Sequence, residues 1–416
     1  MQNKKIEIMS PVGSYESLMA AIQGGADSVY FGVGKLNMRS RSSVNFTLND
    51  LDEIVKTAKE HAIRTYLTVN TIIYNNEIEE MKQVVLRAKS AGITAIIASD
   101  ISVIDFAYRN GVEVHISTQC NVTNIDAVRF YSRFADVMVT ARELSLKQVA
   151  DIIDIINEEK IIGPSGKLVE IEVFAHGALC MAVSGKCYLS LDNKNYSANR
   201  GACLQMCRRS YIVTDKEDRH EYEIDHEYIM SPKDLCTIGF IDKIMKAGVR
   251  VLKIEGRGRS PEYVKTVTKC YKEASLAVLD GSYSKEKVDN WNEQLKTVFN
   301  RGFWDGYYLG RTMGEWSERY GSQSSKVKQH IGKVTNFFSN INIAELQIET
   351  DEIAVGDEVL IIGPSSGVVE TTISEIRVNL KPVVKAIKGE LCSVAVPEIV
   401  RRGDKLYKLV VAIDEY

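Results

Sequence analysis

Four cysteines lie close together near the middle of the chain. Cys180, Cys187, Cys203 and Cys207 fall within 28 positions, and nearby glycines allow the backbone to curl around a compact ligand. Thiolates gathered in this way suit a soft metal centre. The C-x6-C and C-x3-C spacings match neither the paired C-x2-C of a zinc ribbon nor the ferredoxin pattern. The spacing therefore indicates a metal site without naming the metal, and structural zinc or ordinary buried cysteines stay open as alternatives.

The chain has eight cysteines, and the other four are more isolated. Cys236 is a fifth candidate ligand, since it follows the group at a distance that a folded chain can close. Cys120, Cys270 and Cys392 each stand alone in an expected strand or helix, where buried cysteines are common. This usage does not resemble a disulfide framework, and metal or redox chemistry is the better interpretation.

The composition is that of a globular protein. Net charge is −3 in 416 residues, with 45% hydrophobic and 26% charged positions. A chain that is not basic overall still binds RNA if it carries a local basic patch. No stretch approaches the roughly 20 apolar residues that span a bilayer, and the first residues lack the apolar core of a signal peptide. We expect a cytoplasmic protein with no membrane segment.

The first 260 residues alternate short apolar runs with amphipathic segments, a pattern typical of parallel strands joined by helices. Glycines precede several of the strands, in positions that suit a left-handed helix cap. Eight strands predict a closed, TIM-like (β/α)8 barrel of the α/β class. An open doubly wound sheet is the alternative, but no glycine-rich phosphate turn follows the first strand. The predicted strands are Ile6–Met9, Ser28–Phe31, Arg64–Val69, Ala95–Ala98, Glu113–Ser117, Asp136–Val139, Glu170–Ala175 and Arg250–Ile254.

The spacing of the strands breaks once, between the seventh and the eighth. We expect a barrel domain over residues 1–325, with a cysteine-rich insertion at about 179–249 and a helical extension at 261–325. An insertion after the C-terminal end of a barrel strand lies on the catalytic face. Residues 326–416 consist of short strand-like runs with turn signals between them, and predict a small all-β barrel domain.

Three stretches carry a resemblance to a known family. The pattern E-x-F-x2-G-A-L-C-x4-G-x-C-x-L-S spans Glu172 to Ser190, and SPVGS…GGADSVYFG and KIEGRGRSPEYV lie near the two ends of the barrel domain. The chain resembles the peptidase U32 (collagenase-like) family over its whole length. The resemblance implies oxygen-independent hydroxylation rather than proteolysis, with a [4Fe–4S] cluster on four cysteines. The chain is similar to the branch of the family that forms 5-hydroxyuridine at the tRNA wobble position, with prephenate as the source of the hydroxyl group.

The same resemblance implies ligands, partners and alternative substrates. The ligands are Cys180, Cys187, Cys203 and Cys207, and Cys236 is the alternative to Cys207. The expected partner is tRNA rather than DNA, and a second family member is a possible protein partner. Other branches hydroxylate a cytidine of large-subunit ribosomal RNA or the ubiquinone ring. A peptidase, as the family name states, and a zinc-stapled RNA-binding module without catalysis are the competing functions.

Polar residues follow the expected barrel strands, where active sites of this fold lie. Converging arginines suit a dicarboxylate such as prephenate, because a guanidinium binds a carboxylate with two hydrogen bonds. The alternative is that they form ion pairs that close the top of the barrel. The candidate catalytic residues are His176, Arg142 and Glu255, and the candidate substrate-binding residues are Arg39, Arg41, Asn70, Gln119 and Arg257.

His176 precedes Cys180 by four positions, and the sequence allows either a proton donor near the metal or a purely structural hydrogen bond. Basic and aromatic residues around the cysteines are candidates for RNA contact, since tyrosines stack on unpaired bases. A charged, solvated face would explain the same residues. They are Lys186, Arg200, Arg208 and Arg209, with Tyr188, Tyr196 and Tyr211.

Overall fold

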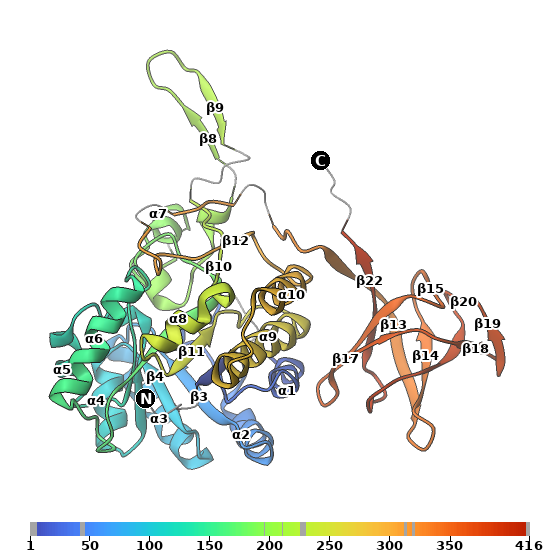
Figure 1. Ribbon diagram of the computed structural model, residues 1–416, viewed down its shortest axis with the longest axis horizontal. Helices are drawn as coiled ribbons and strands as arrows, with labels where there is room; N and C mark the ends of the chain where they lie inside the picture. The colour runs from blue at the N-terminus through green and yellow to red at the C-terminus, as the bar shows by residue number, and fades with distance from the viewer. Residues whose placement is uncertain are drawn as a thin grey trace.

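The computed structural model describes residues 6–41, 46–194, 196–209, 211–224, 230–311, 314–317 and 321–412. Within these residues, eight parallel strands close into a barrel, because the last strand, β11, pairs with both β1 and β7 (Figure 1). The predicted (β/α)8 barrel is therefore confirmed. Its strands are β1 (Glu7–Pro11), β2 (Ser28–Gly32), β3 (Arg64–Val69), β4 (Ala95–Ala98), β5 (Glu113–Ile116), β6 (Val137–Val139), β7 (Glu170–Ala178) and β11 (Val251–Ile254).

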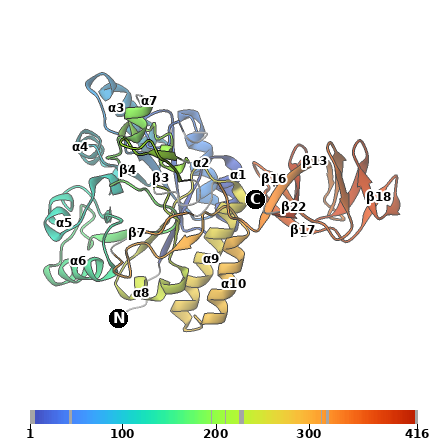
Figure 2. The same cartoon turned by 90° about the horizontal axis from the view of Figure 1, so that it is seen from above.

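Helices surround the barrel, as the view from above shows (Figure 2). Their apolar faces pack against the outer face of the strands, and their ends are capped locally. The Asp100 carboxylate accepts from Ser102 N at the start of α4, and Gly92 ends α3 with a φ of 82°, the left-handed conformation expected of it. The helices are α1 (Tyr15–Gln23), α2 (Leu51–Glu60), α3 (Ile78–Ala91), α4 (Ile101–Arg109), α5 (Ile125–Tyr131), α6 (Leu146–Glu159), α8 (Ile241–Lys246), α9 (Pro261–Asp280) and α10 (Lys285–Lys296).

The segment between β7 and β11 lies over the C-terminal end of the barrel and adds strands to its sheet. β10 (Asp234–Cys236) runs antiparallel to β7 and parallel to β12 (Phe303–Trp304). The hairpin β8 (Tyr211–Thr214) and β9 (Glu221–Ile224) projects away from the barrel (Figure 1). The predicted insertion, 179–249, thus includes α7 (Leu189–Lys194), three strands, and α8, which is the helix that leads into the last barrel strand, β11.

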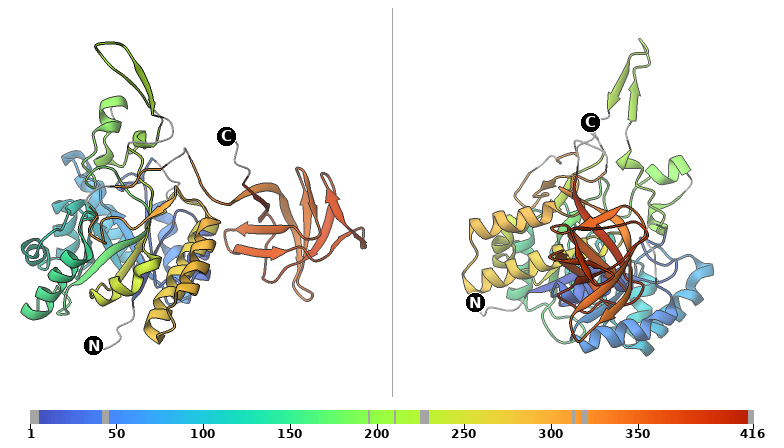
Figure 3. Two further views of the ribbon diagram at one scale, coloured as in Figure 1. Left: turned by 45° about the horizontal axis from the view of Figure 1, so that its top comes forward. Right: turned by 90° about the vertical axis from the view of Figure 1, so that its right-hand side faces the viewer.

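Residues 326–412 form an antiparallel sheet with a separate core, which confirms the predicted all-β domain (Figure 3). Eight strands pair within the described residues in the order β17-β16-β22-β13-β14-β21-β18-β19, and β15 pairs with β20. The strands are β13 (Lys326–Phe338), β14 (Ile343–Ile348), β15 (Glu352–Ala354), β16 (Glu358–Gly363), β17 (Gly367–Thr372), β18 (Ile376–Val378), β19 (Lys381–Val383), β20 (Lys385–Ile387), β21 (Leu391–Ala395) and β22 (Lys405–Val411).

This β domain is fixed to the outer side of the barrel. Gln23, at the end of α1, donates to Ser366 O at 3.0 Å and accepts from Val368 N at 2.9 Å. Lys265 on α9 donates to Val368 O at 2.8 Å, and Val368 is buried in the core of the barrel domain. Paired polar contacts around a buried apolar residue hold the two domains in one relative position.

A bulge near the end of β7 determines which side chains enter the barrel mouth. The pairing with β11 shifts register between Lys253 and Ile254, so Ile254 pairs with His176. Gly177 follows with a φ of 102°, and a Cβ atom there would lie 2.4 Å from Glu255 O. Only glycine fits this backbone, because it has no Cβ and tolerates positive φ.

We expect Gly177→Ala to lower the free energy of unfolding by about 2–4 kcal/mol, because it adds both backbone strain and a clash with Glu255 O. Gly239→Ala is the matched control: its Cβ would meet only Val288 Cγ1, at 3.9 Å. Urea denaturation of both variants measures the difference. Equal stability of the two variants would contradict the role given to the bulge.

Candidate functional site

A cavity of about 640 Å³ lies at the mouth of the barrel, where the loops after the strands meet the cysteine-rich segment. The four cysteines of the dense group line it: Cys180, Cys187, Cys203 and Cys207. The thiols of the other three also act electrostatically on Cys207. No three His, Cys, Asp or Glu side chains among the described residues already stand at the spacing needed for a single metal ion. The four sulfurs therefore share a cavity without meeting at one point.

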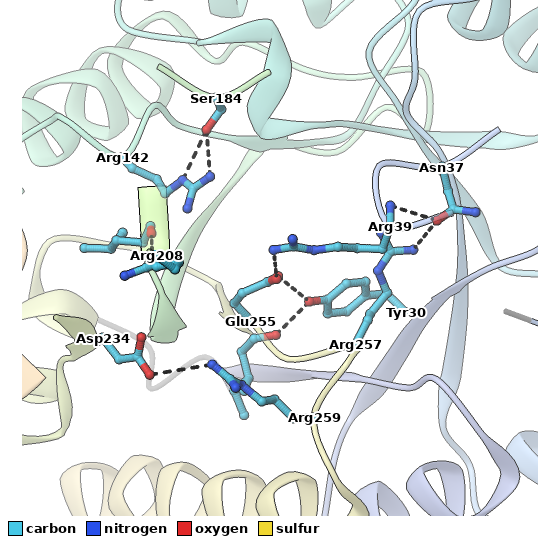
Figure 4. A network of polar contacts seen from close by, with 12 residues as sticks. Tyr30, Asn37, Arg39, Arg142, Ser184, Arg208, Asp234, Glu255, Arg257 and Arg259 are labelled. Atoms are coloured by element: carbon cyan, nitrogen blue, oxygen red, sulfur yellow. Dashed lines mark hydrogen bonds and ion pairs between the residues drawn. The ribbon is translucent and has the colours of Figure 1, made fainter. Parts of the chain in front are cut away.

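The cysteine-rich segment is fastened to the barrel by polar contacts on both sides of the cysteines. Arg200 forms an ion pair with Glu77, in which Nη1 donates to Oε2 at 2.7 Å. Gly201 packs so closely that a Cβ there would lie 2.3 Å from Asn37 O. Arg208 donates to Leu179 O at 2.6 Å, which ties the end of the segment to its beginning (Figure 4). The positions of Cys203 and Cys207 follow from these contacts.

The walls of the cavity carry much more positive than negative charge. Two acidic residues of the described chain, Asp192 and Glu255, line it. The basic lining residues, eight within the described chain, are Arg39, Arg142, Lys186, Arg208, Lys253, Arg257, Arg259 and Arg301. Such a wall favours an anionic ligand, because buried charges need a counter-charge.

Glu255 stands at the centre of one charged network (Figure 4). Its carboxylate accepts from Arg39 Nη2 at 2.6 Å and from Tyr30 Oη at 3.2 Å. Burial acts to raise the pKa of Glu255, but the charges of Arg39 and Arg257 outweigh it and bring the pKa from 4.5 to about 2. Glu255 is therefore ionised at neutral pH and holds Arg39 in place. Ion pairing, the alternative that the sequence left open for the arginines, therefore applies to Arg39.

Three further arginines, Arg142, Arg208 and Arg257, donate to neutral oxygens. Arg142 donates from Nη2 to Ser184 Oγ at 2.8 Å, and Arg257 donates to Thr68 Oγ1 at 2.8 Å and to Asn37 Oδ1 at 3.1 Å. Burial lowers the pKa of Arg257 and of Arg208 to about 10, so both stay charged at neutral pH. No side-chain carboxylate of the described residues lies within hydrogen-bond distance of these three arginines.

Asn70 and Gln119 supply neutral polar groups to the same cavity. Asn70 Nδ2 donates to Ser117 Oγ and to Gln119 Oε1, both at 3.2 Å. The two amides lie at the ends of β3 and β5, as the sequence predicts, and both line the cavity. Amides placed in this way are able to bind the polar edge of a ligand ring.

Three candidate residues lie elsewhere. His176 is buried beside Tyr263, Tyr271 and Phe303 and does not line the cavity; burial, with the charge of Arg259, lowers its pKa to about 3. A neutral, enclosed imidazole is not a proton donor, so the geometry favours the structural alternative. The register shift in β7 is the reason, because it turns His176 away from the mouth.

Cys236 and Arg41 are also outside this cavity. Cys236 lies on β10, with Tyr271 Oη 3.9 Å from its sulfur, and burial raises its thiol pKa to about 11. Arg41 stacks on Tyr196 at 4.6 Å and lines a separate hollow. The structure therefore groups Cys207, and not Cys236, with the other three cysteines, and it separates Arg41 from Arg39.

Several residues of the site were not predicted from the sequence. Lys253 lies at the floor of the cavity and forms a buried ion pair with Glu172 at 2.7 Å. Arg301, from the segment after α10, reaches the wall and lies 3.4 Å from Asp234. The pair of Lys253 and Glu172 had a signal in the sequence, because charged residues inside strands buried on both faces are rare. Arg301 had none, since its position depends on the short strands β10 and β12.

Residues 13–318 match peptidase family U32. A protein of Porphyromonas gingivalis named "Collagenase" is 56% identical over 408 residues, which cover 98% of this chain and 99% of the relative. "tRNA hydroxylation protein P1" of Bacillus subtilis is 32% identical over 369 residues, covering 87% of this chain and 84% of the relative. "23S rRNA 5-hydroxycytidine C2501 synthase" of Escherichia coli is 32% identical over 323 residues, covering 76% and 47%. In the part of this chain that the structure describes, no helix is both long and apolar enough to cross a membrane.

The ion pair of Glu255 gives a testable pH dependence. Since the pKa in the folded protein, about 2, is below the ordinary 4.5, the pair adds stability above about pH 4.5 and loses it as the pH falls toward 2. We expect Glu255→Gln to lower the free energy of unfolding by on the order of 3 kcal/mol at pH 7. The difference between native and variant protein should shrink from pH 4.5 downward in urea titrations. A difference that is constant over this range would contradict the assignment.

Proposed function

This chain belongs to peptidase family U32, and we propose that it takes part in the hydroxylation of RNA rather than in the cleavage of peptides. The proposed reaction forms 5-hydroxyuridine at the tRNA wobble position without oxygen, with prephenate as the source of the hydroxyl group. The observation that carries the proposal is that four cysteines line one cavity together with more basic than acidic residues. The hydroxylation proteins among the relatives support the same reaction class.

A [4Fe–4S] cluster fits the donor set. Cys180, Cys187, Cys203 and Cys207 would each bind a different iron atom, so the four sulfurs are required around a shared space rather than at one point. Cys180 is exposed and the other three are partly exposed, so the cluster has a route of entry. When bound, such a cluster supplies one-electron redox chemistry. A structural zinc ion is the alternative occupant of the same thiols.

The residues of this chain would bind and orient the reactants. Arg142, Arg208 and Arg257 line the cavity and carry charge that the two carboxylates of prephenate would neutralise. Glu255 would keep Arg39 aimed at the cavity, as a positioning residue. Asn70 and Gln119 would hold the polar edge of the pyrimidine ring.

A peptidase is the competing function, because the relative at 56% identity is named "Collagenase". The cavity offers little for this chemistry. Its described lining includes no histidine to activate a thiol, and burial raises the pKa of Cys207 to about 11, which disfavours the thiolate.

Two further expectations from the sequence, location in the cytoplasm and a second family member as protein partner, stay predictions.

The metal and its ligands are tested by purification without oxygen. We expect a brown protein with about four irons and four sulfides per chain, because four thiolates around one cavity suit a cubane cluster. Cys203→Ser and Cys207→Ser should each lose most of the iron, whereas Cys236→Ser, the matched control, should keep it. Stoichiometric zinc in a colourless protein, or loss of iron only in the control, would contradict the assignment.

The reaction is tested on cellular RNA. Deletion of the gene should remove 5-hydroxyuridine-derived nucleosides from tRNA, as measured by mass spectrometry, in a strain that has no second family member with this activity. Native protein should restore them, and Cys203→Ser should not. Unchanged tRNA together with lost 5-hydroxycytidine would move the substrate to ribosomal RNA. Gelatin cleavage by the anaerobic protein, abolished by Cys203→Ser, would overturn the proposal in favour of a peptidase.

A further inference from the structure

A second hollow, of about 950 Å³, lies beside the cysteine-lined cavity. We call it the flanking hollow. It is open to the surface, and its described lining combines basic, aromatic and acidic side chains. The lining residues on which the argument rests are Lys35, Arg41, Tyr74, Glu77, Tyr196 and Arg200.

The two hollows share their walls. Met38 and Arg39 line the cavity, and the next residues, Ser40 and Arg41, line the flanking hollow. Along the cysteine-rich segment the same alternation occurs, since Cys203 lines the cavity and its neighbour Ala202 lines the flanking hollow. A ligand that fills the cavity and continues beyond it would therefore find the flanking hollow one backbone thickness away.

Two tyrosines in the flanking hollow are held as exposed stacking surfaces. The Arg200 guanidinium lies 4.0 Å from the ring centre of Tyr74, and that of Arg41 lies 4.6 Å from the ring centre of Tyr196. Tyr74 nevertheless keeps 54% of its surface exposed, and Tyr196 keeps 37%. Exposed tyrosines paired with arginines are suited to flat, unpaired bases, because both groups stack on ring faces.

The charges of the flanking hollow also favour bases over dense phosphate. Arg200 is paired with Glu77, and Lys35 is paired with Glu80 at 2.8 Å. Arg41 has no acidic partner among the described residues, and its contact is the ring of Tyr196. With two of the three cations neutralised, the hollow attracts one or two nucleotides weakly through charge and mainly through stacking.

We propose that the flanking hollow binds the nucleotide next to the one whose base enters the cavity, with that neighbouring base stacked on Tyr196 or Tyr74. This inference rests on the proposed RNA hydroxylation. An enzyme that modifies a base must take it out of the stack, so the adjacent bases lose a stacking partner at the rim of the site. The flanking hollow supplies the replacement for the stacking that they lose.

The test is binding of a fluorescently labelled anticodon stem-loop RNA to the iron-loaded protein, measured by anisotropy. At least one of Tyr74→Ala and Tyr196→Ala should weaken binding roughly 5- to 100-fold, as removal of a base–aromatic stack does. Tyr74→Phe and Tyr196→Phe should retain near-native binding, because the ring is kept. Tyr108→Ala is the matched control, since Tyr108 is 43% exposed on α4 and lines neither hollow. Iron content should be equal in all variants.

The outcomes separate this inference from the proposed function. Native protein that binds the RNA, together with alanine variants that bind as well as the control, would overturn the flanking hollow alone. Native protein that binds no RNA would overturn the proposed function and this inference together. Weakening by alanine and retention by phenylalanine supports the stacking role, and an effect equal to that of Tyr108→Ala contradicts it.

Discussion

Positive charge buried at the mouth of the barrel is the constraint around which the site is arranged. Burying a guanidinium is costly unless an opposite charge or good acceptors replace its water. Glu255 supplies the opposite charge for Arg39, and Asp234 supplies it for Arg301. Glu172 supplies it for Lys253. Arg142, Arg208 and Arg257 donate hydrogen bonds only to neutral oxygens in the described residues. The cavity therefore favours an anionic occupant. A thiolate-bound cluster and a dicarboxylate both carry the negative charge that would balance these arginines.

The scaffold brings these groups together through close backbone contacts rather than through long side chains alone. Gly177 allows β7 to bulge against Glu255, and Gly201 allows the cysteine-rich segment to lie against Asn37. Arg208 ties Leu179 to the end of that segment. Each contact acts at the C-terminal edge of the barrel, where loop residues are positioned by strands that the core holds rigid.

Much of the fold could be predicted from the sequence, because regularly spaced apolar residues indicate both the type of an element and the face that it buries. The ranges Arg64–Val69 and Ala95–Ala98 are the same in the prediction and the structure. β10 and β12 were not found, since strands of three and two residues show no alternation. The grouping of the cysteines could be anticipated from their spacing. The direction of His176 could not, because a single bulge reverses the side-chain alternation on which such a prediction depends.

We propose that one iron-containing group occupies the arginine-lined cavity and is bound by its four cysteines. Anomalous diffraction at the iron edge, from crystals grown without oxygen, would locate that group. Iron density is expected within bonding distance of the sulfurs of Cys180, Cys187, Cys203 and Cys207, with Cys236 apart from it. Anomalous signal at the zinc edge alone, or iron bound away from these sulfurs, would contradict it.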